Sequence, residues 1–174
     1  MSTETTPIVP HQAGEFFAWL WWTTEERSGA IDLGGDLGSV DVWVDERLAF
    51  RHPADTKISA VMTGDNPSAS LESRAAMAGG KVLQEVRIGL RREDREYLVT
   101  LKAPAIDIKQ AKMPSGTSDG EDAAIFDRMF FYEELNSILG GLVRRFSDER
   151  ISDAWELEVV PAVRAWINAE RTEA

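Results

Sequence analysis

Apolar residues recur at helical spacing near both ends of this chain and alternate with polar residues in its middle. Near the N-terminus, the sequence EFFAWLWWTTEER places Phe16, Trp19 and Leu20 on one side of a helix that we expect over residues 14–26. From residue 121 to about 148, apolar residues recur every three or four positions, which predicts a long helix. Its stripe consists of Ile125, Met129, Tyr132, Leu135, Leu139, Leu142, Val143 and Phe146. A last helix, bent at Pro161, is expected from residue 152, with a stripe of Trp155, Val159, Val163 and Trp166.

The middle of the chain is typical of β-strands. Residues 39–45 alternate, with Val40, Val42 and Val44 on one face. Further strands are expected over 30–33, 47–51, 57–63, 81–92, 96–103 and 106–108, with a short helix over about 70–78. The predicted fold class is α+β. It has a single antiparallel sheet of about 6–7 strands, on which an N-terminal helix, one short inserted helix and two C-terminal helices pack.

Turn-forming residues divide the chain into few parts. Residues 1–13 are expected to form a flexible tail, and residues 14–174 a single domain with a loop at 114–122. The glycine pair Gly140-Gly141 in the long helix indicates either close packing or a kink. Trp19, Trp155 and Trp166 are predicted to be buried.

Composition narrows the class of protein. The 174 residues include 43% hydrophobic residues and no cysteine, which excludes disulfides and thiolate metal sites. No apolar run is long enough for a membrane span, and the N-terminus does not resemble a signal peptide, so we expect a cytoplasmic protein without a membrane partner. The net charge of −11 is uneven: residues 61–113 carry +2, between flanks of −6 and −7.

No group of residues has the pattern of a catalytic or metal site. His11 and His52 are isolated, and the glycines of residues 34–38 lack the lysine and helix of a phosphate-binding loop. Asp41 and Asp45 share a strand face but are about 13 Å apart. We therefore expect a protein that is not an enzyme and that has no cofactor and no metal.

The succession of segments resembles a known family. The segments are FFAWLWW, GAIDLGG, DERLAF, TGDNPSASLESRAAMAGGKVLQEVRIGL, REYLVTLKA, AKMPSG, IFDRMFFYEELNSILGGLVRRF and SDAWELEVVPAVRAWI. Over roughly residues 14–168, they resemble the C-terminal half of the recombination-associated protein RdgC family, especially its longer bacterial variants. The most characteristic part is the short helix that ends in AGGK and leads into an apolar strand. The family's N-terminal half has no counterpart here.

The resemblance implies a non-enzymatic, DNA-associated function. The family forms ring-like homodimers that take duplex DNA through a basic hole, bind it without sequence preference and restrain a recombinase. It therefore implies a homo-oligomer with duplex DNA and a recombinase or another protein as partners, located at the nucleoid. Strand parity identifies the cations that would contact phosphates on one sheet face: Lys81, Arg87, Arg91, Lys102 and Lys109.

A second interpretation fits the acidity better. An acidic adaptor or inhibitor that kept the fold and changed its partner would bind protein instead of DNA. The acidic helical end and Trp43, on an otherwise polar strand face, favour it. The long helix also carries apolar residues on a second side, among them Phe130 and Phe131, which predicts either a partner surface and a homodimer or cover by the last helix.

Overall fold

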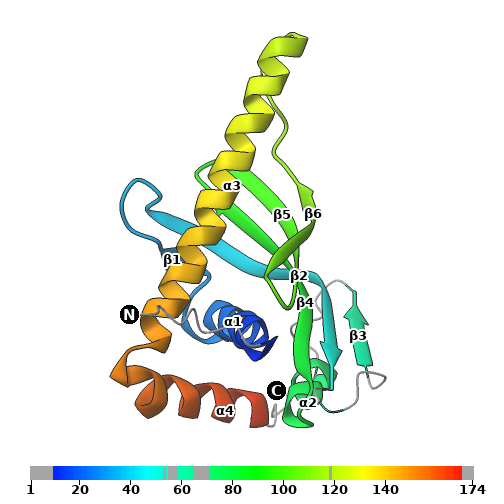
Figure 1. The fold of residues 1–174 in the computed structure, drawn as a ribbon, viewed down its shortest axis with the longest axis vertical. Coiled ribbons are helices and arrows are strands. Elements are labelled where there is room, and N and C mark those ends of the chain that lie inside the picture. The colour runs from blue at the N-terminus through cyan, green and yellow to red at the C-terminus, as the bar shows by residue number, and fades with distance from the viewer. Residues whose placement is uncertain (1–9, 53, 55–58, 65–70, 118, 170–174) are drawn as a thin grey trace, which may run out of the picture.

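The computed structural model describes residues 10–52, 54, 59–64, 71–117 and 119–169. Within them the chain forms a single antiparallel sheet with helices, which confirms the predicted α+β class (Figure 1). The strands are β1 (Ala30–Asp32), β2 (Ser39–Arg51), β3 (Ser59–Thr63), β4 (Val82–Arg92), β5 (Arg95–Lys102) and β6 (Asp107–Lys112). The helices are α1 (Pro10–Trp22), α2 (Leu71–Ala78), α3 (Glu121–Arg150) and α4 (Val160–Asn168), with π-helical turns at Thr23–Arg27 and Trp155–Val159.

Strand β2 organises the sheet. It pairs with β1 and β3 along one side and with β4 along the other, and β5 and β6 complete the order. Two strands separated by a turn at Asp45-Glu46 were expected here, but β2 is continuous. Between Val44 and Leu48 the register with β4 shifts, so the residues between them are accommodated in a bulge that keeps the strand going.

Helix α1 begins at Pro10, earlier than the expected residue 14, so the last residues of the predicted tail are helical. Residues 1–9 of that tail lie outside the described residues. Gly14 lies against β4 so closely that a Cβ at this position would overlap Cγ1 of Val82. This close approach packs α1 against β4.

The core joins the two ends of the chain. Trp19, Trp155 and Trp166 are exposed by only 2%, 8% and 5%, which confirms their predicted burial. The rings of Trp21 and Trp166 meet edge to face with centroids 4.7 Å apart. Phe146 of α3 contacts both Trp19 and Trp155, with centroids 5.5 and 5.7 Å away.

Helix α3 is unbroken from Glu121 to Arg150. Of the two alternatives for the glycine pair, the structure supports close packing: a Cβ on Gly141 would lie 3.1 Å from Cδ1 of Leu33 and 3.3 Å from Cδ1 of Leu37. The C-terminal part of α3 packs on the sheet, whereas its N-terminal part projects beyond the sheet (Figure 1). At the other end of α3 the chain turns into a π-helical turn, Trp155–Val159, which continues directly into α4, and Pro161 lies in the first turn of α4.

Replacing Trp155 tests whether the last helical segment is docked on the core. Trp155→Ala removes a side chain that is 8% exposed, so we expect a loss of about 3–5 kcal/mol in the free energy of unfolding, measured by denaturant titration. Leu157→Ala is the control, because Leu157 in the same π-helical turn is 77% exposed. Equal stabilities of the two variants would contradict this packing.

Candidate functional site

The first candidate surface is the face of the sheet turned away from α1 and α3, here called the outer sheet face. Alternation along β2 directs Val40 and Val42 into the core and Asp41 and Trp43 to the outer sheet face. Cross-strand pairing then places Arg91 beside Asp41, and Gly89 beside Trp43. Its described cations include Arg47, Arg87, Arg91, Lys102, Lys109 and Lys112, and its carboxylates include Asp41, Asp45, Glu85, Glu96 and Asp107, the strand partner of Lys102.

Most of the predicted phosphate contacts are already engaged. Arg87 forms an ion pair with Asp45 at 3.0 Å, and Arg91 donates two hydrogen bonds to Asp41 Oδ2 at 3.0 and 3.2 Å. The Lys109 ammonium lies 3.0 Å from a carboxylate oxygen of Glu85. The neighbouring strands thus supply a carboxylate for each of these three cations. Of the six cations named above, Lys102 and Lys112 have no carboxylate within ion-pair distance among the described residues.

Lys81 lies apart from this set. It precedes β4, and the register shift between Ala49 and Phe50 leaves Gln84 as an extra residue opposite β2. As a consequence Leu83 and Val86, three residues apart, are both buried, at 1% and 0% exposure. The bulge interrupts the alternation of side chains between the two faces of β4. The position of Arg87 on the outer sheet face therefore does not place Lys81 on the same face.

Glu85 is the buried carboxylate at the centre of the outer sheet face. It accepts a hydrogen bond from Arg47 Nε at 2.9 Å and bonds from Lys109 Nζ at 3.0 and 3.3 Å. Burial alone would raise the pKa of Glu85, but the Lys109 and Arg47 contacts outweigh it and hold the pKa below its ordinary value. The carboxylate is therefore ionised at neutral pH and pairs with two cations.

Trp43 lies on the outer sheet face, as the sequence indicates, but it is half-buried. Its indole covers Gly89 on β4, where any Cβ would overlap the ring. A glycine in the middle of a strand is explained here by the space that the ring occupies. Trp43 thus uses one ring face for packing within the sheet.

The second candidate surface is the projecting part of α3. Residues 121–133 are here called the arm. Phe131 is 9% exposed and meets Tyr97 edge to face, so it belongs to the core and is not available as the partner-binding residue that was expected. Phe130 is 50% exposed, with the Arg95 guanidinium 5.6 Å from its ring centroid. Four more apolar side chains of the arm are more than half exposed: Ile125, Phe126, Met129 and Tyr132.

The sequence indicated the apolar stripe of the arm but not its exposure. Ile125, Met129 and Tyr132 continue the stripe of buried residues in the C-terminal part of α3, so they were expected in the core. Helix α4, one of the two covers expected for the second side of this helix, lies at the opposite end of α3 (Figure 1). The stripe therefore faces solvent over a length of helix that neither the sheet nor α4 reaches.

A buried network holds the base of the arm on the sheet. Glu134, 7% exposed, accepts a hydrogen bond from the Tyr97 hydroxyl at 2.6 Å and from Arg95 Nε at 2.7 Å. Arg92 Nη1 donates to its other oxygen at 2.6 Å. Burial would raise the pKa of Glu134, but these bonds outweigh it and hold the pKa below its ordinary value. Burial and the hydrogen bond to Glu134 raise the pKa of Tyr97 above its usual range.

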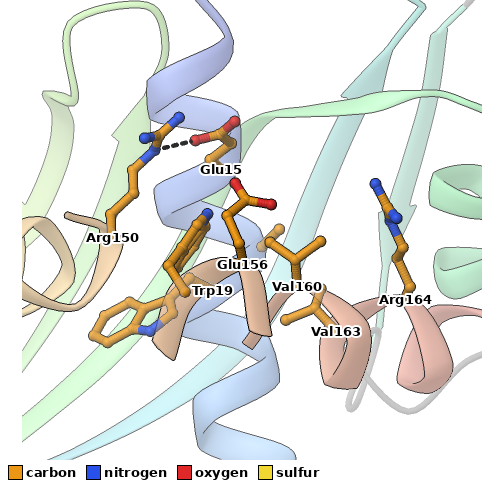
Figure 2. Close-up of a pocket in the computed structure, with 9 residues that line it drawn as sticks. Glu15, Trp19, Arg150, Glu156, Val160, Val163 and Arg164 are labelled. Carbon is orange, nitrogen blue, oxygen red and sulfur yellow. Dashed lines mark hydrogen bonds and ion pairs between the residues drawn. The ribbon is translucent and has the colours of Figure 1, made fainter. Parts of the chain in front are cut away.

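A cleft of about 330 Å³ lies between α1, the end of α3 and α4. Figure 2 shows Trp19, Val160 and Val163 in this cleft, with the Arg150 guanidinium and the Glu15 carboxylate pointing toward one another at 2.6 Å. This hydrogen bond raises the pKa of Arg150. Two carboxylates line the cleft, those of Glu15 and Glu156, and the Glu15 carboxylate is paired with Arg150.

Searches for known chemistry and known relatives add little. No group of three or more histidine or acidic side chains in the described part of the chain is placed to hold a metal ion. No helix in that part is both long and apolar enough to cross a membrane. Comparisons with protein-family models, curated proteins and solved structures find no match to this chain.

Removing the Glu134 carboxylate tests the network. Glu134→Gln leaves Arg92 without its anion and Arg95 with only the exposed carboxylates of Glu93 and Asp94, so we expect a loss of about 3 kcal/mol in unfolding free energy at pH 7. A depressed carboxyl pKa contributes stability that is complete above about pH 4.5 and is lost as the pH falls below that value. Wild type should therefore lose more stability than the variant between pH 5 and 3.

Tyr97→Phe is the matched control for that experiment. It keeps both ion pairs and removes one hydrogen bond to a charged acceptor, which should cost about 1.5–3 kcal/mol. Its stability should still fall on acidification. A Glu134→Gln variant with the same acid sensitivity as wild type would show that Glu134 does not titrate in the folded protein.

Proposed function

We propose that this chain is a non-enzymatic protein-binding module that works through the arm. The main observation behind this proposal is a set of apolar side chains on the arm that are all at least half exposed: Ile125, Phe126, Met129, Phe130 and Tyr132. Contiguous apolar surface of this kind usually marks an interaction site. This function corresponds to the acidic adaptor or inhibitor that the sequence favours as the alternative to a DNA-binding protein.

The attachment of the arm supports this role. Glu134 and its three partners fix α3 directly C-terminal to the exposed residues. Further along the helix, Gly141 packs closely on the loop between β1 and β2. Because the helix is held rigidly at its base, a partner does not have to order it on binding. Preorganisation of this kind reduces the entropic cost of association.

Differential capture tests the proposal. The double variant Phe126→Ser with Met129→Ser removes apolar surface from the arm without touching the core, since these side chains are 69% and 54% exposed. Proteins that wild type captures from a cell lysate should be retained by the control, Ile151→Ser with Leu157→Ser. Those residues are 82% and 77% exposed but lie outside the arm. The arm variant should lose these proteins at least tenfold, and equal capture by both variants would overturn the proposal.

We propose weak binding of duplex DNA as a second function. The resemblance to the RdgC family implies this function, which would modulate recombination or replication. The outer sheet face supports it, because Lys102 and Lys112 on this face have no carboxylate within ion-pair distance among the described residues, on a chain of net charge −11. A shallow hollow of about 400 Å³ on this face is bordered by Arg87 and Lys112.

Salt dependence and charge reversal test the DNA proposal. Five free phosphate contacts would give a log–log salt slope of about −4 to −5, but two free lysines give about −2. Lys102→Glu with Lys112→Glu should weaken binding to all duplex sequences alike, because phosphates carry no sequence information. The control is Arg144→Glu with Arg145→Glu on α3, which changes the net charge by the same amount away from the outer sheet face and should weaken binding less. Absence of any complex in mobility shifts at low salt and tens of micromolar protein would exclude this second function.

A further inference from the structure

The chemistry of the arm indicates what covers it. Ile125, Met129 and Tyr132 follow one another at intervals of four and three residues, so they lie on one side of the helix. Together with Arg128 and Glu133 they border a shallow, mainly apolar hollow of about 390 Å³. A hollow of this size on a helix accommodates an apolar side chain of a partner segment lying along the arm.

The flanks of the arm are strongly acidic. Residues 119–133 contain five carboxylates, those of Asp119, Glu121, Asp122, Asp127 and Glu133, and Arg128 is their one cation. On the side facing the β4–β5 turn, a groove of about 560 Å³ beside Phe130 is bordered by Asp94, Glu96 and Asp127. Arg128 and Glu133 border the hollow, and Arg95 also borders the groove, so the acidic character of the arm comes from the net charge of −4 over residues 119–133.

We propose that the occupant of the arm is a basic amphipathic segment of another protein, which packs an apolar stripe on Ile125, Met129 and Tyr132 and places lysine or arginine beside the acidic flanks. This inference rests on the proposed protein-binding function and specifies its partner. The arm spans about 20 Å at 1.5 Å per residue, so a helical segment of about 14 residues covers it. In this mode of recognition, apolar side chains at helical spacing on the partner bind to an apolar surface.

Charge also argues against a second copy of this chain as the occupant. Two arms packed on each other would bring together two segments that each carry a net charge of −4 over residues 119–133. Like charges across an interface oppose association, whereas a cationic partner gains from the same field. The homodimer expected from the sequence is therefore the competing outcome of the experiment.

Three synthetic peptides of 18 residues serve as probes. The first has leucines at helical spacing flanked by lysines, the second has the same stripe flanked by glutamates, and the third is a scrambled lysine peptide without a stripe. We expect the lysine-flanked peptide to bind wild type with a Kd of tens of micromolar in fluorescence anisotropy. The other two should bind at least tenfold more weakly, and added salt should weaken the lysine-flanked complex.

Variants locate the binding. Phe126→Ser with Met129→Ser should abolish binding of the lysine-flanked peptide, and Asp122→Asn with Glu133→Gln should weaken it about three- to tenfold. Ile151→Ser with Leu157→Ser should bind as wild type does. Binding that is unaffected by the arm variants would overturn the inference, because the peptide would then sit on another part of the acidic surface.

The remaining outcomes separate this inference from the proposed function. Equal binding of the glutamate-flanked peptide, or no binding of any peptide while differential capture succeeds, shows that the arm binds protein but not a basic segment. Light scattering at micromolar concentration detects the competing occupant. A dimer that becomes a monomer in Phe126→Ser with Met129→Ser would identify a second copy and overturn the inference.

Discussion

The carboxylate of Glu134 determines how the long helix sits on the sheet. It accepts hydrogen bonds from Tyr97, Arg92 and Arg95, and Arg92 also donates to the carbonyls of Asp36 and Leu37 in the loop before β2. One buried anion thus joins the β4–β5 hairpin, the β1–β2 loop and α3. An anion so nearly enclosed requires these partners, and they in turn fix the direction in which the arm leaves the sheet.

The two candidate surfaces differ in how many of their charged or apolar side chains already have partners within the protein. On the outer sheet face, the neighbouring strands provide carboxylates for the cations, with Glu85 serving both Arg47 and Lys109. Apart from Phe131, the large apolar side chains of the arm are at least half exposed. This contrast favours a function based on protein contacts over one based on phosphate contacts. A surface whose charges are already paired gains less from a further ion than an apolar surface gains from being buried.

The sequence predicted the kinds of element well and their surroundings less well. Alternation and helical spacing identified the hairpin and the long helix, because these signals are local. The stripe through Ile125 and Met129 looks the same whether or not a sheet lies beneath it, so its exposure was not predictable. The bulges around Asp45 and Gln84 change strand parity without any glycine or proline to mark them. The partners of Glu134 lie about 40 residues away in sequence, beyond any local pattern.

The contact between the two ends of the core has a consequence for biosynthesis. Trp21 packs against Trp166, and the indole of Trp19 donates a hydrogen bond to Glu149. A ribosome adds about 5–20 residues per second, so residues 149 and 166 are synthesised several seconds or more after the tryptophans of α1. During that interval Trp19 and Trp21 lack part of their native cover. The aromatic cluster of α1 therefore completes its packing only when synthesis of the chain is almost finished.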